Sequence, residues 1–328
     1  HVSHKWNDIL QISIRAVFFA LLCWTFFWLL ILWRSSKSRQ VSFSVALMRF
    51  LKGESNYPLR AIAIVTGIVT IVIFLSMFIG SKYHLFGTDK VGQDVFYQAI
   101  KSIRTGILIG ALTTLVMLPV AVTLGAMAGF FRGWVDDVIQ YIYTTLNSIP
   151  HVLLIAASVL LLQVYISNNA EGFDSLTERA DLRLLFLCVI LGITSWTGLC
   201  RLLRAETFKL REMEYIQAAS AFGVTKANIL ARHIMPNFMH IVLITVVLDF
   251  SGLVLAEAVL SYINIGVDPA TNSWGNMINQ ARLEMARDPA VWWSLTAAFI
   301  FMFTLVLFAN LFADVVRDAL DPRISGSE

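Results

Sequence analysis

Residues 61–80 read AIAIVTGIVTIVIFLSMFIG, a continuous run without a charged side chain. An α-helix rises 1.5 Å per residue, so about 20 apolar residues span the hydrocarbon core of a bilayer. The apolar side chains are continuous rather than alternating, which excludes a strand of a transmembrane β-barrel. The stretch therefore predicts a membrane-spanning helix.

The whole chain has the composition of a membrane protein. Of its 328 residues 57% are hydrophobic and only 14% are charged, against about 25% charged in a typical soluble domain. The mean hydropathy is +0.71. We therefore predict an all-α, polytopic bundle of transmembrane helices. The segments expected to span lie at about 10–33, 61–80, 105–131, 138–166, 184–203, 238–263 and 291–314.

Composition and motifs also exclude several classes of function. The net charge of +3 is too small to indicate a nucleic-acid partner. Cys23, Cys188 and Cys200 all lie in or beside apolar segments, so they predict neither a disulfide framework nor a metal site. The chain contains no P-loop motif, no HExxH and no GxSxG. We expect no enzymatic activity and no cofactor bound by this chain.

One long polar stretch interrupts the apolar second half. Residues 210–237 read LREMEYIQAASAFGVTKANILARHIMPN. A helix is expected over Thr207–Phe222, followed by a turn at Gly223, where glycine tolerates a left-handed backbone. A second helix is expected from the N-cap Thr225 to Arg232, and Pro236 then opens the next apolar segment. Two short helices of this kind would form a protruding handle for another protein.

The spacing of this stretch resembles the cytoplasmic EAA loop of ABC importer permeases, which docks onto the ATPase subunit. Gln217 stands where that loop usually has Glu, and Glu214 lies one helical turn earlier. The resemblance implies coupling helices within 207–236 and places this loop in the cytoplasm, together with most of the 25 Lys and Arg residues. The implied coupling residues are Glu212, Glu214, Gln217, Ala218, Ala219, Gly223, Lys226 and Pro236.

Three further segments resemble the dipeptide, oligopeptide and nickel branch of these permeases, and its C-type subunit in particular. They are GTDKVGQD at 87–94, where Gln93 replaces the usual Arg, LAEAVLSYINIG at 255–266, and DVVRDALDPR at 314–323. The resemblance covers about residues 60–325. It implies a six-helix permease core over 61–328, preceded over 1–60 by an accessory transmembrane helix and a basic cytoplasmic linker.

Candidate residues for the translocation path lie in two of the apolar segments. Pro150 is expected to kink the span 138–166, so Asn147, Ser148 and His151 either line a path or satisfy the opened backbone. Asp249 and Glu257 are acids embedded in an apolar run and lie about two helical turns apart. They either line a path for a polar solute or bond to a neighbouring helix.

Two carboxylates are candidates for the outer mouth. Asp89 and Asp94 bracket a glycine-containing turn, and Asp94 can cap a helix that starts at Val95. Contact with a binding protein and simple rigidity of the loop both remain open. With seven spans residue 1 would lie outside, so either a preceding segment has been removed or residues 2–14 lie along the membrane surface.

The resemblance implies a subunit of an ATP-driven importer in the bacterial inner membrane, with di- or oligopeptides as substrates. This chain would form half of the path, with a second, homologous permease subunit as a heterodimeric partner. Two ABC ATPase subunits would use the ATP, an extracytoplasmic solute-binding protein would deliver the solute, and lipid would surround the chain. The alternatives are a secondary active transporter or an ABC permease for nickel or another small solute.

Overall fold

The computed structural model describes residues 2–38, 42–52, 58–169, 175–286, 288 and 290–320, and the regular elements in these ranges are all helical. The chain divides into two compact units, His1–Thr88 and Asp89–Glu328. The first contains α1 (Val2–Ser38), α2 (Phe43–Lys52) and α3 (Leu59–Gly80). The second contains α4 (Val95–Phe131), α5 (Trp134–Ser148), α6 (His151–Asn168), α7 (Leu176–Arg211), α8 (Glu214–Ala221), α9 (Lys226–Ile229), a π-helical turn (Leu230–Ile234), α10 (Met235–Tyr262), α11 (Trp274–Glu284) and α12 (Trp293–Leu320).

In the first unit, α1 packs along α3 through aromatic side chains. The indole N–H of Trp24 donates to the carbonyl oxygen of Ala63 at 3.1 Å, and that of Trp28 donates to the hydroxyl of Thr66 at 3.1 Å. Gly67 leaves room for the Trp24 ring, because an added Cβ would lie 3.2 Å from the indole nitrogen. Hydrogen bonds satisfied inside an apolar contact hold two membrane helices together specifically.

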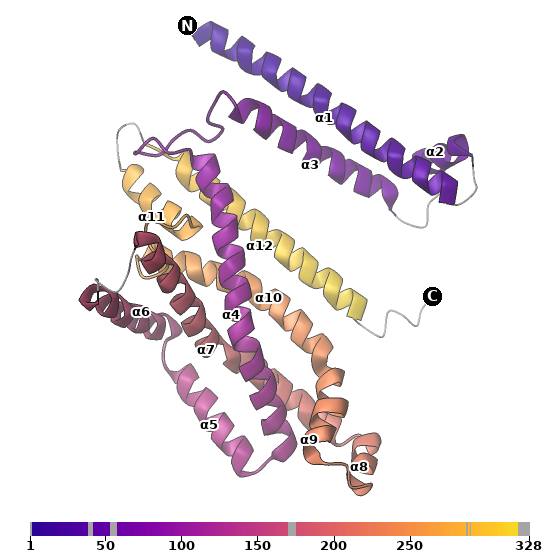
Figure 1. Cartoon of the computed structure of the whole chain (residues 1–328), viewed down its shortest axis with the longest axis vertical. Coiled ribbons are helices and arrows are strands. Elements are labelled where there is room, and N and C mark those ends of the chain that lie inside the picture. Colours follow the sequence, from indigo (N-terminus) through magenta and orange to yellow (C-terminus); the bar gives the residue numbers. More distant parts are fainter. Residues whose placement is uncertain are drawn as a thin grey trace. The chain divides into compact units, whose positions relative to one another are not determined.

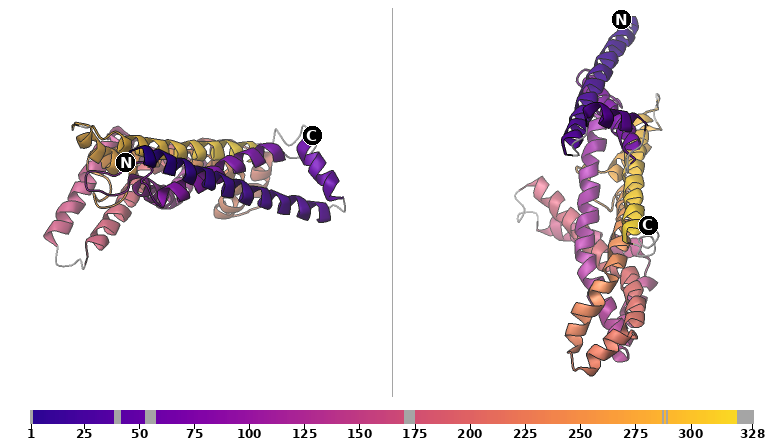
Figure 2. Two further views of the ribbon diagram at one scale, coloured as in Figure 1. Left: turned by 90° about the horizontal axis from the view of Figure 1, so that it is seen from above. Right: turned by 90° about the vertical axis from the view of Figure 1, so that its right-hand side faces the viewer.

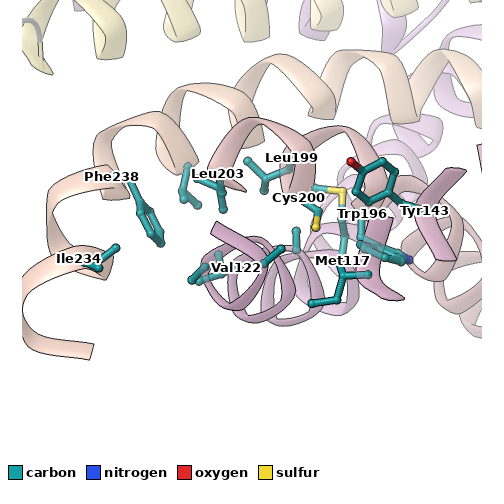
Figure 3. Packing of buried hydrophobic residues seen from close by; sticks show 14 of the residues in the cluster. Met117, Val122, Tyr143, Trp196, Leu199, Cys200, Leu203, Ile234 and Phe238 are labelled. Carbon is teal, nitrogen blue, oxygen red and sulfur yellow. The ribbon is translucent and has the colours of Figure 1, made fainter. Parts of the chain in front are cut away.

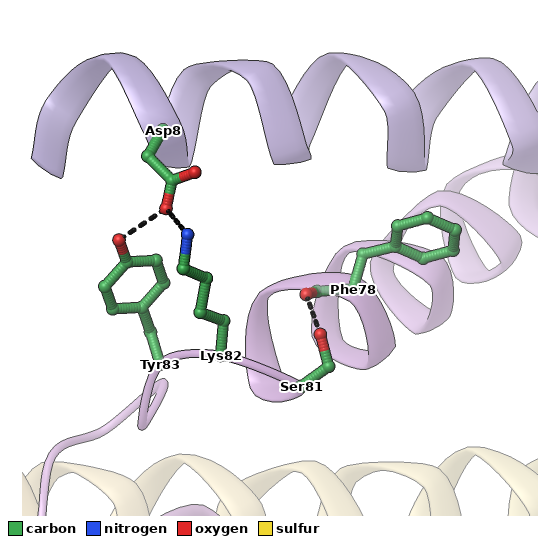
Figure 4. A network of polar contacts seen from close by, with 5 residues as sticks. All are labelled: Asp8, Phe78, Ser81, Lys82 and Tyr83. Carbon is green, nitrogen blue, oxygen red and sulfur yellow. Dashed lines mark hydrogen bonds and ion pairs between the residues drawn. The ribbon is translucent and has the colours of Figure 1, made fainter. Parts of the chain in front are cut away.

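The other end of this helix pair is held by a polar cluster (Figure 4). Lys82 donates to Asp8 at 2.5 Å, and the hydroxyl of Tyr83 donates to the same carboxylate oxygen at 2.6 Å. The hydrogen bond to Asp8 raises the pKa of Lys82 and that of Tyr83 above their usual values. The shared carboxylate of Asp8 thus favours the protonated form of both side chains.

The second unit is built around α4 and α7, which run side by side, with α10 and α12 packed beside α4 (Figure 1). The two central helices contain 37 and 36 residues. At 1.5 Å per residue they are about 55 Å long, well beyond the roughly 30 Å of a hydrocarbon core. These two helices are therefore longer than the hydrocarbon core is thick, and α8 and α9 lie at their shared end (Figure 2).

The expected polytopic helical fold is confirmed, because the described part of the chain contains seven helices long and apolar enough to span a membrane. The single kinked span expected over 138–166 is wrong. Ile149 is extended (φ −92°, ψ 128°), and the chain starts a new helix, α6, after Pro150. A residue before proline is pushed out of the helical region, so the proline separates two helices instead of bending one.

The single helix expected over Thr207–Phe222 is also wrong, because the structure divides this range between two helices. Helix α7 ends at Arg211, Met213 is extended, and α8 begins at Glu214. The break turns α8 so that Ile216 is buried, with 2% of its surface exposed. Burial of that side chain outweighs the local preference for an unbroken helix.

The second short helix is not a separate element either. The chain passes from α9 through the π-helical turn directly into α10, with Pro236 in the first turn of that helix as expected. Thr225 has the extended backbone of an N-cap, but its side chain makes no capping hydrogen bond. The boundary at residue 60, which rests on family resemblance, stays a prediction; by packing, α3 belongs with α1 and α2.

Candidate coupling loop and translocation path

The contact between α4 and α7 depends on two glycines of α4. An added Cβ on Gly125 would lie 2.8 Å from the carbonyl oxygen of Cys200, and one on Gly129 would lie 2.5 Å from Cβ of Thr207. The small residues four apart therefore allow the two helix backbones to touch. The polar loop lies at one end of this closely packed helix pair.

A buried hydrophobic cluster joins this helix pair to the polar loop (Figure 3). Leu199, Cys200 and Leu203 of α7 face Met117 and Val122 of α4. The same cluster continues through residues of α8, α9, the π-helical turn and α10, namely Ile216, Ile229, Ile234 and Phe238. Packed side chains thus connect the loop to three membrane helices, α4, α7 and α10.

The polar loop presents a small, exposed surface. Gly223 has φ +77°, a conformation that other residues adopt only at a cost, and it separates α8 from α9. Ala218 is exposed, whereas Ala219 is half-buried against the hydrophobic cluster. Phe222, at the tip, is 87% exposed. We call Glu212–Pro236 the coupling loop, and its surface combines small side chains with large apolar ones, of which Phe222 is the most exposed.

Charged and polar side chains surround the base of the coupling loop. Arg132, at the end of α4, donates to Glu212 at 2.8 Å, and the amide of Gln217 donates to the carbonyl oxygen of Glu212 at 3.1 Å. Glu214 and Lys226 are exposed. A groove of about 550 Å³ lies between α8, α9 and the ends of α4 and α7, with Gln217 and Lys226 in its lining. Gln217 thus makes a structural contact at the position where the resembling loops carry Glu.

An ion pair that we did not predict ties α5 to the same end of α7. Arg204 donates through Nε and Nη2 to the two carboxylate oxygens of Asp136, at 2.5 and 2.7 Å. Only 8% of the surface of Asp136 is exposed. Bidentate pairs of this kind fix orientation as well as distance. The only signal in the sequence was the opposite charge of two residues near the inner ends of neighbouring helices.

The candidates near Pro150 lie at the break between α5 and α6. The hydroxyl of Thr197 on α7 donates to Oδ1 of Asn147 at 2.9 Å, so Asn147 connects the end of α5 to α7. His151 is the first residue of α6 and is exposed, as is Ser148. These residues do lie together at one break in the helix, and their role in lining a path stays a prediction.

The two intramembrane acids have different surroundings. Glu257 is buried, with 1% of its surface exposed, and accepts from the Ser261 hydroxyl at 2.6 Å. Ser261 in turn accepts from the N–H of Val267, so Glu257 supports the turn that follows α10. Asp249 is half-buried and lies two turns nearer the coupling loop. This geometry favours a packing role for Glu257 and leaves Asp249 as the better candidate for a path.

The outer pair, Asp89 and Asp94, shapes a loop. Asp89 accepts from the N–H groups of Val91 and Gln93 at 2.9 and 2.8 Å, and Asp94 caps α4 by accepting from the N–H of Tyr97 at 3.0 Å. The capping function of Asp94 is confirmed, and a role of the pair at the outer mouth stays a prediction. In the described ranges, no group of three His, Cys, Asp or Glu side chains could hold a metal ion.

The chain is similar to known transport proteins. A family model described as "Binding-protein-dependent transport system inner membrane component" matches residues 121–326. Oligopeptide transport system permease protein OppC of Mycobacterium tuberculosis is 32% identical over 243 residues, which cover 74% of this chain and 77% of OppC. Glutathione transport system permease protein GsiD of Pectobacterium atrosepticum is 30% identical over 246 residues, 74% of each chain. A solved inward-facing structure of the MetNI methionine ABC transporter aligns with a TM-score of 0.49 at 16% identity, covering 67% of this chain and 93% of that one.

Proposed function

This chain belongs to the family of binding-protein-dependent transport system inner membrane components, and on that premise we propose that it is the permease subunit of an importer for short peptides. A component of this family is a multi-pass protein of the bacterial inner membrane that works with an ATPase and a binding protein and is not itself an enzyme. An ion-driven secondary transporter does not fit that family. Peptides, rather than nickel, agree with the oligopeptide and glutathione permeases that the chain resembles.

The position of the coupling loop and its connection to the helix bundle support the proposal. Its exposed helices α8 and α9 protrude at the end of a rigid helix pair and connect to it through Ile216, Ile229 and the ion pair of Arg132 with Glu212. A nucleotide-driven ATPase that binds these helices would pull on α4, α7 and α10 together. Because the ATPase would bind one arrangement of the helix bundle more tightly than the other, it would shift the path between outward-open and inward-open states.

A complete path needs a second permease subunit. One chain of this size encloses only part of a central passage, and we propose a heterodimer of homologous permeases served by two ATPase subunits. Asn147, His151 and Asp249 are our candidates for the lining of the shared path. Among the coupling residues, Ala218 offers the sharpest test, because it is exposed and packs against no part of the hydrophobic cluster.

The test is Ala218→Glu in the assembled importer. We expect the variant to reach the membrane in normal amount and to lose co-purification with the ATPase, because a charged side chain would stand where a close contact is needed. ATP-driven uptake of trialanine into proteoliposomes should fall by more than tenfold. Ala319→Glu is the matched control, since Ala319 is also exposed but lies near the end of α12. Normal ATPase binding and uptake in Ala218→Glu would refute coupling through this loop.

A further inference from the structure

The end of the second unit opposite the coupling loop contains a hollow of about 910 Å³. Its walls come from the first part of α4, the end of α6, the start of α7 and residues 268–272. Figure 2 shows α6 and the start of α7 as a hairpin that stands out from α4. The charged side chains of the lining are Lys101, Arg104, Arg179, Arg183, Asp181 and Asp268. Cations outnumber carboxylates, so the hollow has a positive potential, and its shape concentrates that field.

Two of these cations are exposed to the space in the hollow. Lys101 and Arg104 are three residues apart on α4 and therefore lie on one face of the helix. Nζ of Lys101 lies 4.9 Å from the centre of the Tyr97 ring. Arg104 makes no hydrogen bond or ion pair with any residue that the structure describes. Both ammonium and guanidinium groups are thus available to a bound anion.

Arg183 has a different role in the same hollow. It is buried and donates to the carbonyl oxygens of Gly266 and Asn264 at 2.8 and 3.1 Å. When the oxygen and nitrogen of the Gln163 side-chain amide are exchanged, its oxygen accepts from Nη2 of Arg183 at 2.9 Å. Thr105 closes the opposite wall by donating to the carbonyl oxygen of Asn272 at 2.7 Å. These bonds hold the walls in place, so the hollow is formed before any solute arrives.

We propose that this hollow binds the C-terminal carboxylate of a short peptide at the outer end of the path. The inference rests on the proposed function. The volume of the hollow lies within the range of about 300–1,000 Å³ that is typical of sites for small molecules. Lys101 and Arg104 supply charge-assisted hydrogen bonds to the carboxylate, and the exposed Asp181 supplies an acceptor for the peptide's amino group. A concave site of this size fits a zwitterionic solute better than the convex face of a folded protein.

The experiment compares a peptide acid with its amide. The full importer complex is placed in nanodiscs without the binding protein, and equilibrium binding of radiolabelled trialanine and trialaninamide is measured. Loss of a charge-assisted contact typically corresponds to about a tenfold change in affinity, so the unmodified complex should prefer the acid by about that factor. The double variant Lys101→Gln with Arg104→Gln should bind both peptides equally. Lys90→Gln is the matched control, because Lys90 is also exposed, in the loop before α4, but does not line the hollow.

Each outcome decides the question. An unchanged preference for the acid in the double variant would overturn the proposal, as would equal binding of acid and amide, or no binding, by the unmodified complex. If the double variant kept that preference but lost stimulation of the ATPase by the binding protein, the two cations would form a docking surface instead. Uptake of trialanine by the complete importer tests the proposed function separately. That function stands if uptake is normal, even when the preference for the carboxylate is absent.

Discussion

Gly129 in the α4–α7 contact and Gly223 in the coupling loop are both needed by the fold, but for different physical reasons. Space is lacking at Gly129, where an added Cβ would lie 2.5 Å from Cβ of Thr207 and 2.7 Å from the carbonyl oxygen of Arg204. Space is plentiful at Gly223, where no atom lies within 4 Å of an added Cβ, yet φ is +77°. One glycine is required by packing between helices and the other by backbone geometry.

The comparison indicates that stability and coupling depend on different parts of the second unit. The α4–α7 contact is buried and close-packed, so a change there affects the fold of the whole second unit. The coupling loop is exposed at Gly223, so a change at this position alters the shape of the loop without removing much buried surface. Variants at the two glycines should therefore differ in what they lose: the folded protein in one case and the transmission of force in the other.

The largest effect is expected for Gly129→Val. Its branched side chain would collide with the backbone of α7, which cannot move aside as a flexible side chain can. Overpacking of this kind costs about 3 kcal/mol or more, and we expect little folded protein in the membrane. The measurement is the yield and the thermal unfolding midpoint in mild detergent.

Gly198→Ala on α7 is the control, because an added Cβ there meets no atom within 4 Å. This variant should unfold at the same temperature as the unmodified protein or slightly higher, since alanine favours helix more than glycine does. Equal stability of Gly129→Val and the unmodified chain would show that α4 and α7 are not held together by this contact.

Gly223→Pro should have a smaller effect on stability and a large effect on transport. Proline restricts φ to about −65°, far from +77°, and removes the N–H that Gly223 donates to the carbonyl oxygen of Ser220 at 3.1 Å. The turn between α8 and α9 would open, while the α4–α7 contact stays intact. We expect normal yield, with ATP-driven uptake and stimulation of the ATPase reduced at least tenfold.

Gly223→Asn sharpens the same comparison. Asparagine tolerates positive φ better than other side chains, so this variant should retain much of the uptake. If the proline variant transported normally, the shape of this turn would be irrelevant to coupling. If instead both variants failed equally, the absence of a side chain, rather than the backbone angle, would be the important property.

Features that depend on a single stretch of sequence could be predicted. Seven apolar runs predicted the correct number of candidate spans, because crossing a bilayer requires length and hydrophobicity alone. The residue type of Gly223 predicted its backbone, because glycine tolerates a positive φ. Asp94 predicted a helix start for the same reason, since a cap is formed by neighbours in sequence.

Features that depend on tertiary contact could not be predicted from the sequence. The break after Arg211 exists because Ile216 is buried against helices far away in sequence, and this same burial makes Ala218 exposed and Ala219 half-buried. The ion pair of Asp136 and Arg204 joins residues on α5 and α7 whose proximity follows only from the packed structure. The embedded position of Glu257 predicted a special environment, but not that Ser261 would be its partner.

The smallest effect is expected for Glu257→Gln. Glutamine can still accept from the Ser261 hydroxyl, and the side chain has 1% of its surface exposed, so no solute reaches it in this arrangement. We therefore expect a loss of uptake of only a few fold, equal for the neutral peptide Ala-Ala-Ala and the cationic peptide Ala-Lys-Ala. Asp249→Asn is the matched comparison, because Asp249 is half-buried on the same helix and is expected to affect the cationic peptide more strongly. A loss selective for the cationic peptide in Glu257→Gln would place that carboxylate on the path, and the packing that encloses it would then have to open during transport.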